Sequence, residues 1–193
     1  FYRSGSAAAR YRPAELPEAA IHGARILHLS GISQAISETA CDAGFRAIEL
    51  ARIGMSSGAG GPFGAVVVKD GEIVGEGYNR VISTLDPTAH GEITAIRDAC
   101  GKLVSFSPAG SEIHTTGQPC PMCLGAIHWA RIAKIHYGFR IEDAAAIGFD
   151  DSEFFRQMTL PPEQRAIPSH ELCREEALVL AHEYSMLPGR RHY

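Results

Sequence analysis

The sequence lacks several features that would point to particular classes of protein. No apolar run approaches membrane-spanning length, and the first 30 residues contain no secretory hydrophobic core. We therefore expect no membrane association, no signal peptide and a cytoplasmic location. The 18 lysines and arginines are outnumbered by 22 aspartates and glutamates, which gives a formal net charge of −4. Because phosphate contacts need basic side chains, we expect a small-molecule substrate and no nucleic-acid partner.

Cysteine is also scarce, and its arrangement excludes a further class. An odd count of five cysteines with irregular spacing argues against the disulfide framework of a small secreted protein. Three of them fit apolar helical stripes and are predicted to be small buried hydrophobes: Cys41, Cys100 and Cys173. Internal repeats are absent too, and 193 residues suit a single domain. We interpret residues 1–30 as a poorly patterned N-terminal extension of a domain that spans residues 31–193.

The first half of the chain alternates helical and strand patterns. Apolar spacing predicts a helix from about residue 32 to residue 53. Residues 63–79 are typical of two strands joined at Asp70-Gly71, a strong hairpin signal. A helix that starts near His90 is expected to bury its apolar side chains: Ile93, Ile96, Cys100 and Leu103.

The second half continues this alternation and then loses it. The pattern predicts two strands, at 111–116 and 133–139, and a helix between them from Pro119 to about Arg131. Residues 148–169 are expected to form an irregular loop, followed by a last helix from about His170. That helix carries an apolar stripe of Cys173, Ala177, Leu180, Ala181 and Tyr184. Strands that alternate with helices after a hairpin favour one mixed sheet with helices on both faces.

Two short motifs carry the chemistry. The H-x-E of His90 and Glu92 could be an ordinary helix start, and the P-C-x-x-C of residues 119–123 could be structural or redox-active. Together they are the signature of zinc nucleobase deaminases. Three protein ligands, His90, Cys120 and Cys123, would leave the fourth position of one Zn²⁺ per subunit open to water, as in catalytic sites.

Glu92 then has a chemical role beside that metal. Zinc can lower the pKa of a bound water to about 7, and a nearby carboxylate can take the proton from zinc-bound water and return it to a ring nitrogen and a leaving amine. We therefore predict Glu92 as the catalytic proton shuttle. Two alternatives stay open. A nucleophilic pair of Cys120 with a histidine would explain neither Cys123 nor Glu92, and a non-catalytic zinc module would need no proton shuttle.

The segment from about Ala47 to Asp151 resembles the cytidine deaminase superfamily. Four stretches in it are similar to the bacterial guanine deaminase branch: "GGPFGAVVVKDG", "DPTAHGEITAIRDAC", "PCPMCLGAIHWAR" and "GFDD". The resemblance implies a three-layer α/β/α fold with a mixed five-stranded central sheet. It also implies the hydrolysis of free guanine to xanthine and ammonia. Guanosine, another amino-purine, a triazine, cytosine or an adenosine in tRNA are the alternative substrates.

The resemblance also implies substrate-binding residues. Asn79 matches the base-binding asparagine, Phe63 and Trp129 match aromatic positions around the ring, and Asp151 matches a carboxylate that contacts the amino edge. Tyr193 matches a C-terminal tyrosine that closes the pocket, on a tail that the family exchanges between the subunits of a homodimer. Each has an ordinary alternative: core aromatics for Phe63 and Trp129, a turn for Asn79, a loop cap for Asp151 and a frayed end for Tyr193.

The sequence departs from the family at two positions near the motifs. Gly91 stands where alanine is usual, and we predict that the missing methyl slightly enlarges the pocket wall. Gln118 stands where glutamate is more frequent, which removes a charge near the metal. His114 and His136, on the expected strands, are interpreted as structural histidines.

Overall fold

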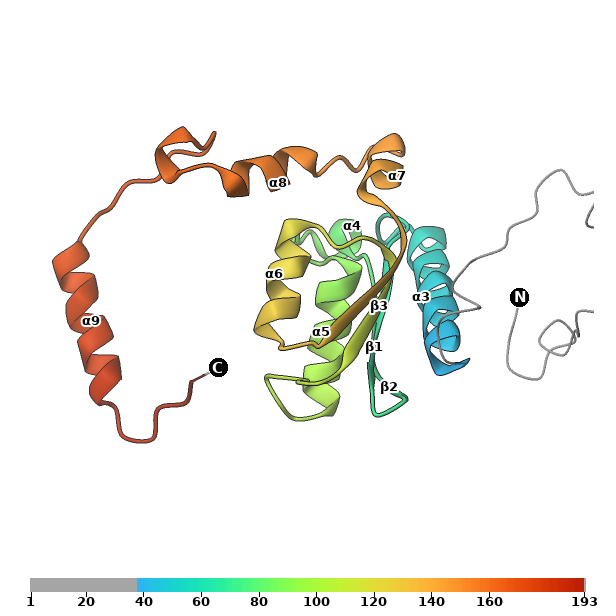
Figure 1. Ribbon diagram of the computed structural model, residues 1–193, viewed down its shortest axis with the longest axis horizontal. Coiled ribbons are helices and arrows are strands. Elements are labelled where there is room, and N and C mark those ends of the chain that lie inside the picture. Colours follow the sequence, from blue (N-terminus) through green and yellow to red (C-terminus); the bar gives the residue numbers. More distant parts are fainter. Residues whose placement is uncertain (1–37, 193) are drawn as a thin grey trace, which may run out of the picture.

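The computed structural model describes residues 38–192 (Figure 1). The expected N-terminal extension, residues 1–30, and the expected pocket-closing Tyr193 lie outside the described residues. Within the described range the chain forms a sheet with helices on both faces, followed by a helical C-terminal arm (Figure 1).

The sheet has the strand order β2-β1-β3-β4. Its strands are β1 (Gly64–Lys69), β2 (Glu72–Tyr78), β3 (Glu112–Gly117) and β4 (Lys134–Phe139). Strand β1 pairs antiparallel with β2 and β3, whereas β3 and β4 are parallel, so the sheet is mixed as expected. The predicted hairpin is confirmed, and Asp70 and Gly71 both have the positive φ that a tight hairpin turn requires, 51° and 83°.

The expectation of a five-stranded sheet was wrong, since the described residues contain a sheet of four strands. After β4 the chain turns into α7 (Ile141–Ala146) instead of a further strand. Its sequence Ile-Glu-Asp-Ala-Ala-Ala is rich in alanine, the strongest helix former, and an aspartate that accepts a hydrogen bond from the Arg140 amide stabilises its first turn.

Helices cover both faces of the sheet, which confirms the expected three layers (Figure 1). Helix α3 (Glu38–Ser56) packs on one face, where its Ala43 and Leu50 contact Val66 and Val68 of β1. Helices α5 (Gly91–Lys102) and α6 (Pro121–Trp129) lie on the other face. The core there consists of Ala65, Val67, Ala95, Ala99, Ile113 and Ile127. The short α4 (Val81–Thr84) connects β2 to the loop before α5.

Helix α5 buries a different face from the one its apolar residues predict. Its buried residues are Gly91, Glu92, Ala95 and Ala99, while Ile93, Ile96, Cys100 and Leu103 are only partly buried. The reason is the close approach of α5 to β2, because a Cβ at Gly75 or Gly77 would lie within 2.6 Å of α5 atoms. Only small side chains fit between a helix and a strand at that distance, so the larger isoleucines lie beside the contact.

The C-terminal arm also differs from expectation. Residues 148–169 were predicted to be irregular, yet they contain α8 (Ser152–Thr159) and a 3₁₀ turn, η3 (Pro162–Gln164). The last helix is confirmed as α9 (Arg174–Met186), but its apolar stripe is not buried, because every residue from 161 to 192 is exposed. Cys173 is therefore exposed, and Cys41 and Cys100 are only partly buried. The arm extends away from the sheet, so the rest of the described chain does not pack against the apolar side chains of the arm (Figure 1).

No helix among residues 38–192 combines the length and the apolar character needed to cross a membrane.

Candidate active site

The structure brings the three predicted metal ligands together at the N-terminal ends of two neighbouring helices. His90 is the N-cap of α5, Cys120 is the N-cap of α6, and Cys123 lies in the first turn of α6 behind Pro121. The Nδ1 atom of His90 lies 3.6 Å from the Sγ atom of Cys120 and 3.6 Å from that of Cys123. A helix N-terminus carries partial positive charge and free N–H groups, which favour thiolate over thiol.

These distances fit a tetrahedral zinc ion. With Zn–S bonds of about 2.3 Å and Zn–N bonds of about 2.05 Å, tetrahedral geometry places sulfur and nitrogen ligands about 3.6 Å apart. Both His90–cysteine distances have that value, and all three donor atoms lie within 4.8 Å of one another. Imidazole and two thiolates are also the donor types that zinc prefers. The residues present therefore fit the metal, with three donors from the described chain.

Electrostatics within this cluster favour the ligand form of Cys120, whereas His90 and Cys123 hold their protons until a cation is bound. A hydrogen bond from the Cys123 thiol, together with one from the His90 ring, lowers the pKa of Cys120 to about 4. The hydrogen bond with Cys120 in turn raises the pKa of His90. The same shared hydrogen bond and burial raise the pKa of Cys123, because a second negative charge beside the Cys120 thiolate is unfavourable. A cation among the three donors would remove that repulsion.

Glu92 lies in the first turn of α5 beside the cluster. Its side chain is buried, with 6% exposure, and its carboxyl group interacts electrostatically with the Cys123 sulfur. Burial raises the pKa of Glu92, and the negative charge of Cys120 raises it further. The carboxylate is therefore held against the metal ligands without belonging to the three-donor group, as a proton shuttle requires.

Asp151, which precedes α8, interacts electrostatically with this cluster. Burial raises the pKa of Asp151 first, and the charge of Cys120 raises it further, so the carboxyl group lies within electrostatic reach of the thiolate. Its Oδ1 atom is buried and is the single buried side-chain oxygen or nitrogen of the described residues without a hydrogen-bond partner. A buried acceptor without a donor is costly, which indicates a site completed by a ligand.

Phe63 forms an aromatic cluster with two residues that no sequence motif marks as functional, Phe139 and Phe149. Its ring meets that of Phe149 edge-on, with centroids 4.9 Å apart, and that of Phe139 at 5.7 Å. Phe149 lies two positions before Asp151, so its place in the "GFDD" stretch was the available signal. The cluster connects the start of β1 with the ends of β4 and α7.

Asn79 is buried at the end of β2, with 4% exposure. Its backbone N–H donates to the Phe63 carbonyl over 2.8 Å, and its side-chain Oδ1 accepts from the Val81 backbone N–H over 3.2 Å. The side chain thus stabilises the start of α4, which is the turn role considered as its ordinary alternative. Its contact with Phe63 places it beside the aromatic cluster.

The prediction for Gly91 needs correction. A Cβ at this position would lie 2.8 Å from the Phe63 carbonyl oxygen and 3.3 Å from the Gly64 Cα. The missing methyl therefore faces the backbone at the start of β1, where the glycine allows α5 to pack closely. It does not enlarge a pocket wall.

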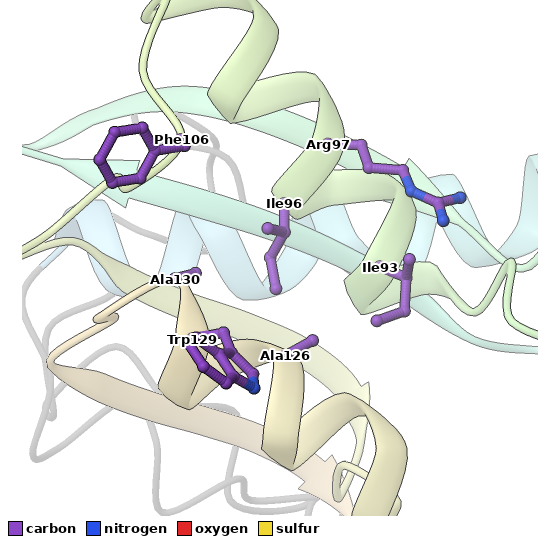
Figure 2. A pocket seen from close by; sticks show the side chains of 7 residues that line it. All are labelled: Ile93, Ile96, Arg97, Phe106, Ala126, Trp129 and Ala130. Carbon is purple, nitrogen blue, oxygen red and sulfur yellow. The ribbon is translucent and has the colours of Figure 1, made fainter. Parts of the chain in front are cut away.

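Trp129 is not brought to the metal ligands within this chain. It ends α6, nine residues after Cys120, which is about 13 Å along the helix axis. The residue is 67% exposed, and its ring lies over a groove between α5 and α6 (Figure 2). The groove is lined by Ile93, Ile96, Arg97, Phe106, Ala126, Trp129 and Ala130.

The comparisons with known proteins agree with this geometry. The sequence profile of the cytidine and deoxycytidylate deaminase zinc-binding region matches residues 38–139. The chain is 44% identical to guanine deaminase of Bacillus subtilis over 148 residues, which cover 77% of this chain and 95% of that protein. The crystal structure of that enzyme superposes with a TM-score of 0.75 at 43% identity, covering 79% of this chain and 97% of the other.

A tRNA-specific adenosine deaminase of Agrobacterium fabrum is 39% identical over 98 residues, which are 51% of this chain and 64% of that protein.

The fold, the donor cluster and the relatives together define a zinc-dependent aminohydrolase, an enzyme that removes an amino group with water. More particularly, the chain belongs to the cytidine and deoxycytidylate deaminase zinc-binding family.

Proposed function

We propose that this chain catalyses the hydrolytic deamination of free guanine to xanthine and ammonia. The observation that carries the proposal is the buried Glu92 beside three metal donors, with the unpartnered Oδ1 of Asp151 near the same cluster. The likeness to the Bacillus subtilis guanine deaminase extends over nearly all of that protein, which supports guanine as the substrate.

His90, Cys120 and Cys123 would hold the zinc ion. When bound, zinc acts as a Lewis acid that makes water a good nucleophile at neutral pH. The N-terminus of α6 would favour both thiolates once the cation is bound, and the closely packed α5 would keep His90 in place.

Glu92 would move the protons of the reaction. Its carboxylate would take one proton of the attacking water and give it to a ring nitrogen. It would then take the second proton from the same oxygen and give it to the amino group, which leaves as ammonia when the C–N bond breaks. Its burial excludes bulk water, so a proton held on Glu92 is passed to the substrate and not to solvent.

Asp151 and Asn79 would recognise the base. Guanine presents N–H donors along its amino edge, and the unpartnered Asp151 Oδ1 is an acceptor already desolvated for them. Asn79 carries an amide that offers both a donor and an acceptor. Phe63, supported edge-on by Phe149, would pack against the ring, because aromatic faces stack favourably on bases.

Completion of the site would involve a second copy of the chain. Among the described residues, the arm from 161 to 192 is wholly exposed, and the apolar groove at Trp129 is open. We infer a homodimer in which the C-terminal segments are exchanged, so that Tyr193 of each copy closes the other site. In this arrangement Trp129 would act at the interface between copies and not in its own metal cluster.

Deamination of adenosine in tRNA is the second candidate, because 98 residues are 39% identical to a tRNA-specific adenosine deaminase. The net charge of −4 opposes it, since a polyanionic substrate needs a basic surface. The two candidates separate by substrate: incubation of the zinc-loaded enzyme with guanine should yield xanthine, and incubation with tRNA should yield no inosine.

Asp151→Asn tests base recognition in the same assay. It should lower kcat/KM for guanine at least about tenfold with zinc content unchanged, because a charged acceptor of the substrate's donors is lost. Asp150→Asn is the matched control, since Asp150 is exposed. Equal kcat/KM for both variants would contradict the role of Asp151.

A further inference from the structure

A second group of metal-binding side chains lies outside the active site. Glu112 and His114 are two residues apart on β3, so both point to the same face of the sheet. His136 lies opposite His114 on the parallel strand β4. On its other side His114 pairs with Val66, whose side chain packs against α3, so the group lies on the face that α3 covers.

Both imidazoles converge on one carboxylate oxygen. The Nε2 atom of His136 lies 2.8 Å from Oε2 of Glu112, and the Nε2 atom of His114 lies 4.0 Å from the same oxygen. The two rings stack with centroids 4.3 Å apart and an angle of 13° between their planes. All three donor atoms lie within 4.8 Å of one another.

We propose that Glu112, His114 and His136 form a second site, distinct from the active site, for a divalent transition-metal ion. Tetrahedral coordination with bonds of about 2.0–2.1 Å places donors about 3.4 Å apart. The two distances to Oε2, 2.8 and 4.0 Å, lie on either side of that value. Because the lone pair of each Nε2 lies in its ring plane, one of the two stacked rings would rotate out of the stack to direct its Nε2 at the same ion. Two imidazoles and one carboxylate suit Zn²⁺, Co²⁺ and Ni²⁺, whereas Mg²⁺ and Ca²⁺ prefer oxygen donors.

Lys134 is the competitor for this site. Its Nζ atom lies 2.7 Å from Oε1 of Glu112, while the other oxygen faces the imidazoles. The lysine side chain is 60% exposed, so it can move into solvent when a metal neutralises the carboxylate. If the group were only an ion-pair network, Lys134 would be part of it and no metal would bind.

Occupancy would fasten the start of β3 to the start of β4, two strands whose other ends lead toward active-site residues. Strand β3 ends three residues before Cys120, and β4 leads through α7 to Asp151. A metal bound across the two strands stabilises the folded state alone, so it raises the melting temperature. It does not contact the substrate, so turnover should stay the same.

Metal content and cobalt spectra test the proposal on the zinc-loaded enzyme. After equilibrium dialysis against a small excess of free Zn²⁺, wild-type enzyme should hold two equivalents per chain, one for each donor group. His136→Gln and Glu112→Gln should each hold one and keep guanine turnover. The matched control His128→Gln, an exposed histidine on α6, should hold two. Co²⁺ added to wild-type enzyme with one zinc should give ligand-field bands without the thiolate charge-transfer band of a cysteine site.

Lys134→Ala separates a metal site from an ion-pair network. Because the competing cation is gone, the second equivalent should bind at least about threefold more tightly than in wild type. One equivalent in wild type would overturn the proposal. So would a second equivalent that persists in both His136→Gln and Glu112→Gln, because that metal would lie elsewhere.

Discussion

Replacement of Glu92 by glutamine tests whether the Glu92 carboxylate transfers protons during deamination. Glutamine has the same shape as glutamate and leaves the three metal donors in place, so the variant should keep its zinc. It cannot accept and return a proton. General acid–base catalysis contributes about 10²–10⁴-fold, so kcat should fall by that factor, which corresponds to about 3–5 kcal/mol in the barrier.

The stability of the Glu92→Gln variant should change little. Glu92 is buried with a raised pKa, so the replacement removes an unfavourable buried charge and creates no cavity. The assay combines guanine turnover, zinc content and the urea midpoint of each variant. Glu72→Gln, at an exposed position of the hairpin, is the matched control and should behave like wild type. A zinc-loaded Glu92→Gln enzyme with kcat within about threefold of wild type would refute the role of Glu92.

Three further outcomes follow from the geometry. Cys120→Ala should lose the active-site zinc and turnover, whereas Cys173→Ala should keep both in the same metal assay, because Cys173 is exposed. Gly91→Ala should cost about 1–3 kcal/mol in urea unfolding, since its Cβ would meet the start of β1, whereas Gly101→Ala on the same helix meets nothing and should be neutral or stabilising. Burial lowers the pKa of His114 from 6.5 to about 4, so the unfolded chain binds a proton that the native chain excludes. Stability in buffer without added divalent metal should therefore fall as the pH falls from about 6.5 to about 4, and equal urea midpoints across this range would contradict it.

The metal ligands could be predicted from sequence because their chemistry is local. His90 and Cys120 each precede a helix, and Cys123 follows within one turn, so the motif itself fixes how the donors are presented. Which segments meet at the site depends on tertiary contacts. Phe149 and Phe139 are ordinary aromatics until the fold brings them to Phe63.

The fold was predicted well where the pattern reports a local preference and poorly where it depends on a neighbour. The hairpin at Asp70-Gly71 needs only positive φ at the turn, which these residues supply. The buried face of α5 depends on Gly75 and Gly77 in β2, so the pattern of α5 alone pointed to the wrong residues. The apolar stripe of α9 is exposed for the same reason. The sequence pattern predicts that a helix has an apolar face, but it does not predict whether another part of the chain packs against that face.

The most direct test of the central claim is a substrate comparison with the zinc-loaded, full-length enzyme. Guanine, guanosine, adenine, cytosine and tRNA are supplied in parallel, and ammonia and the deaminated product are measured for each. We predict stoichiometric xanthine and ammonia from guanine, with little turnover of the others. Absence of xanthine from guanine, or inosine formed in tRNA at a higher kcat/KM, would contradict it.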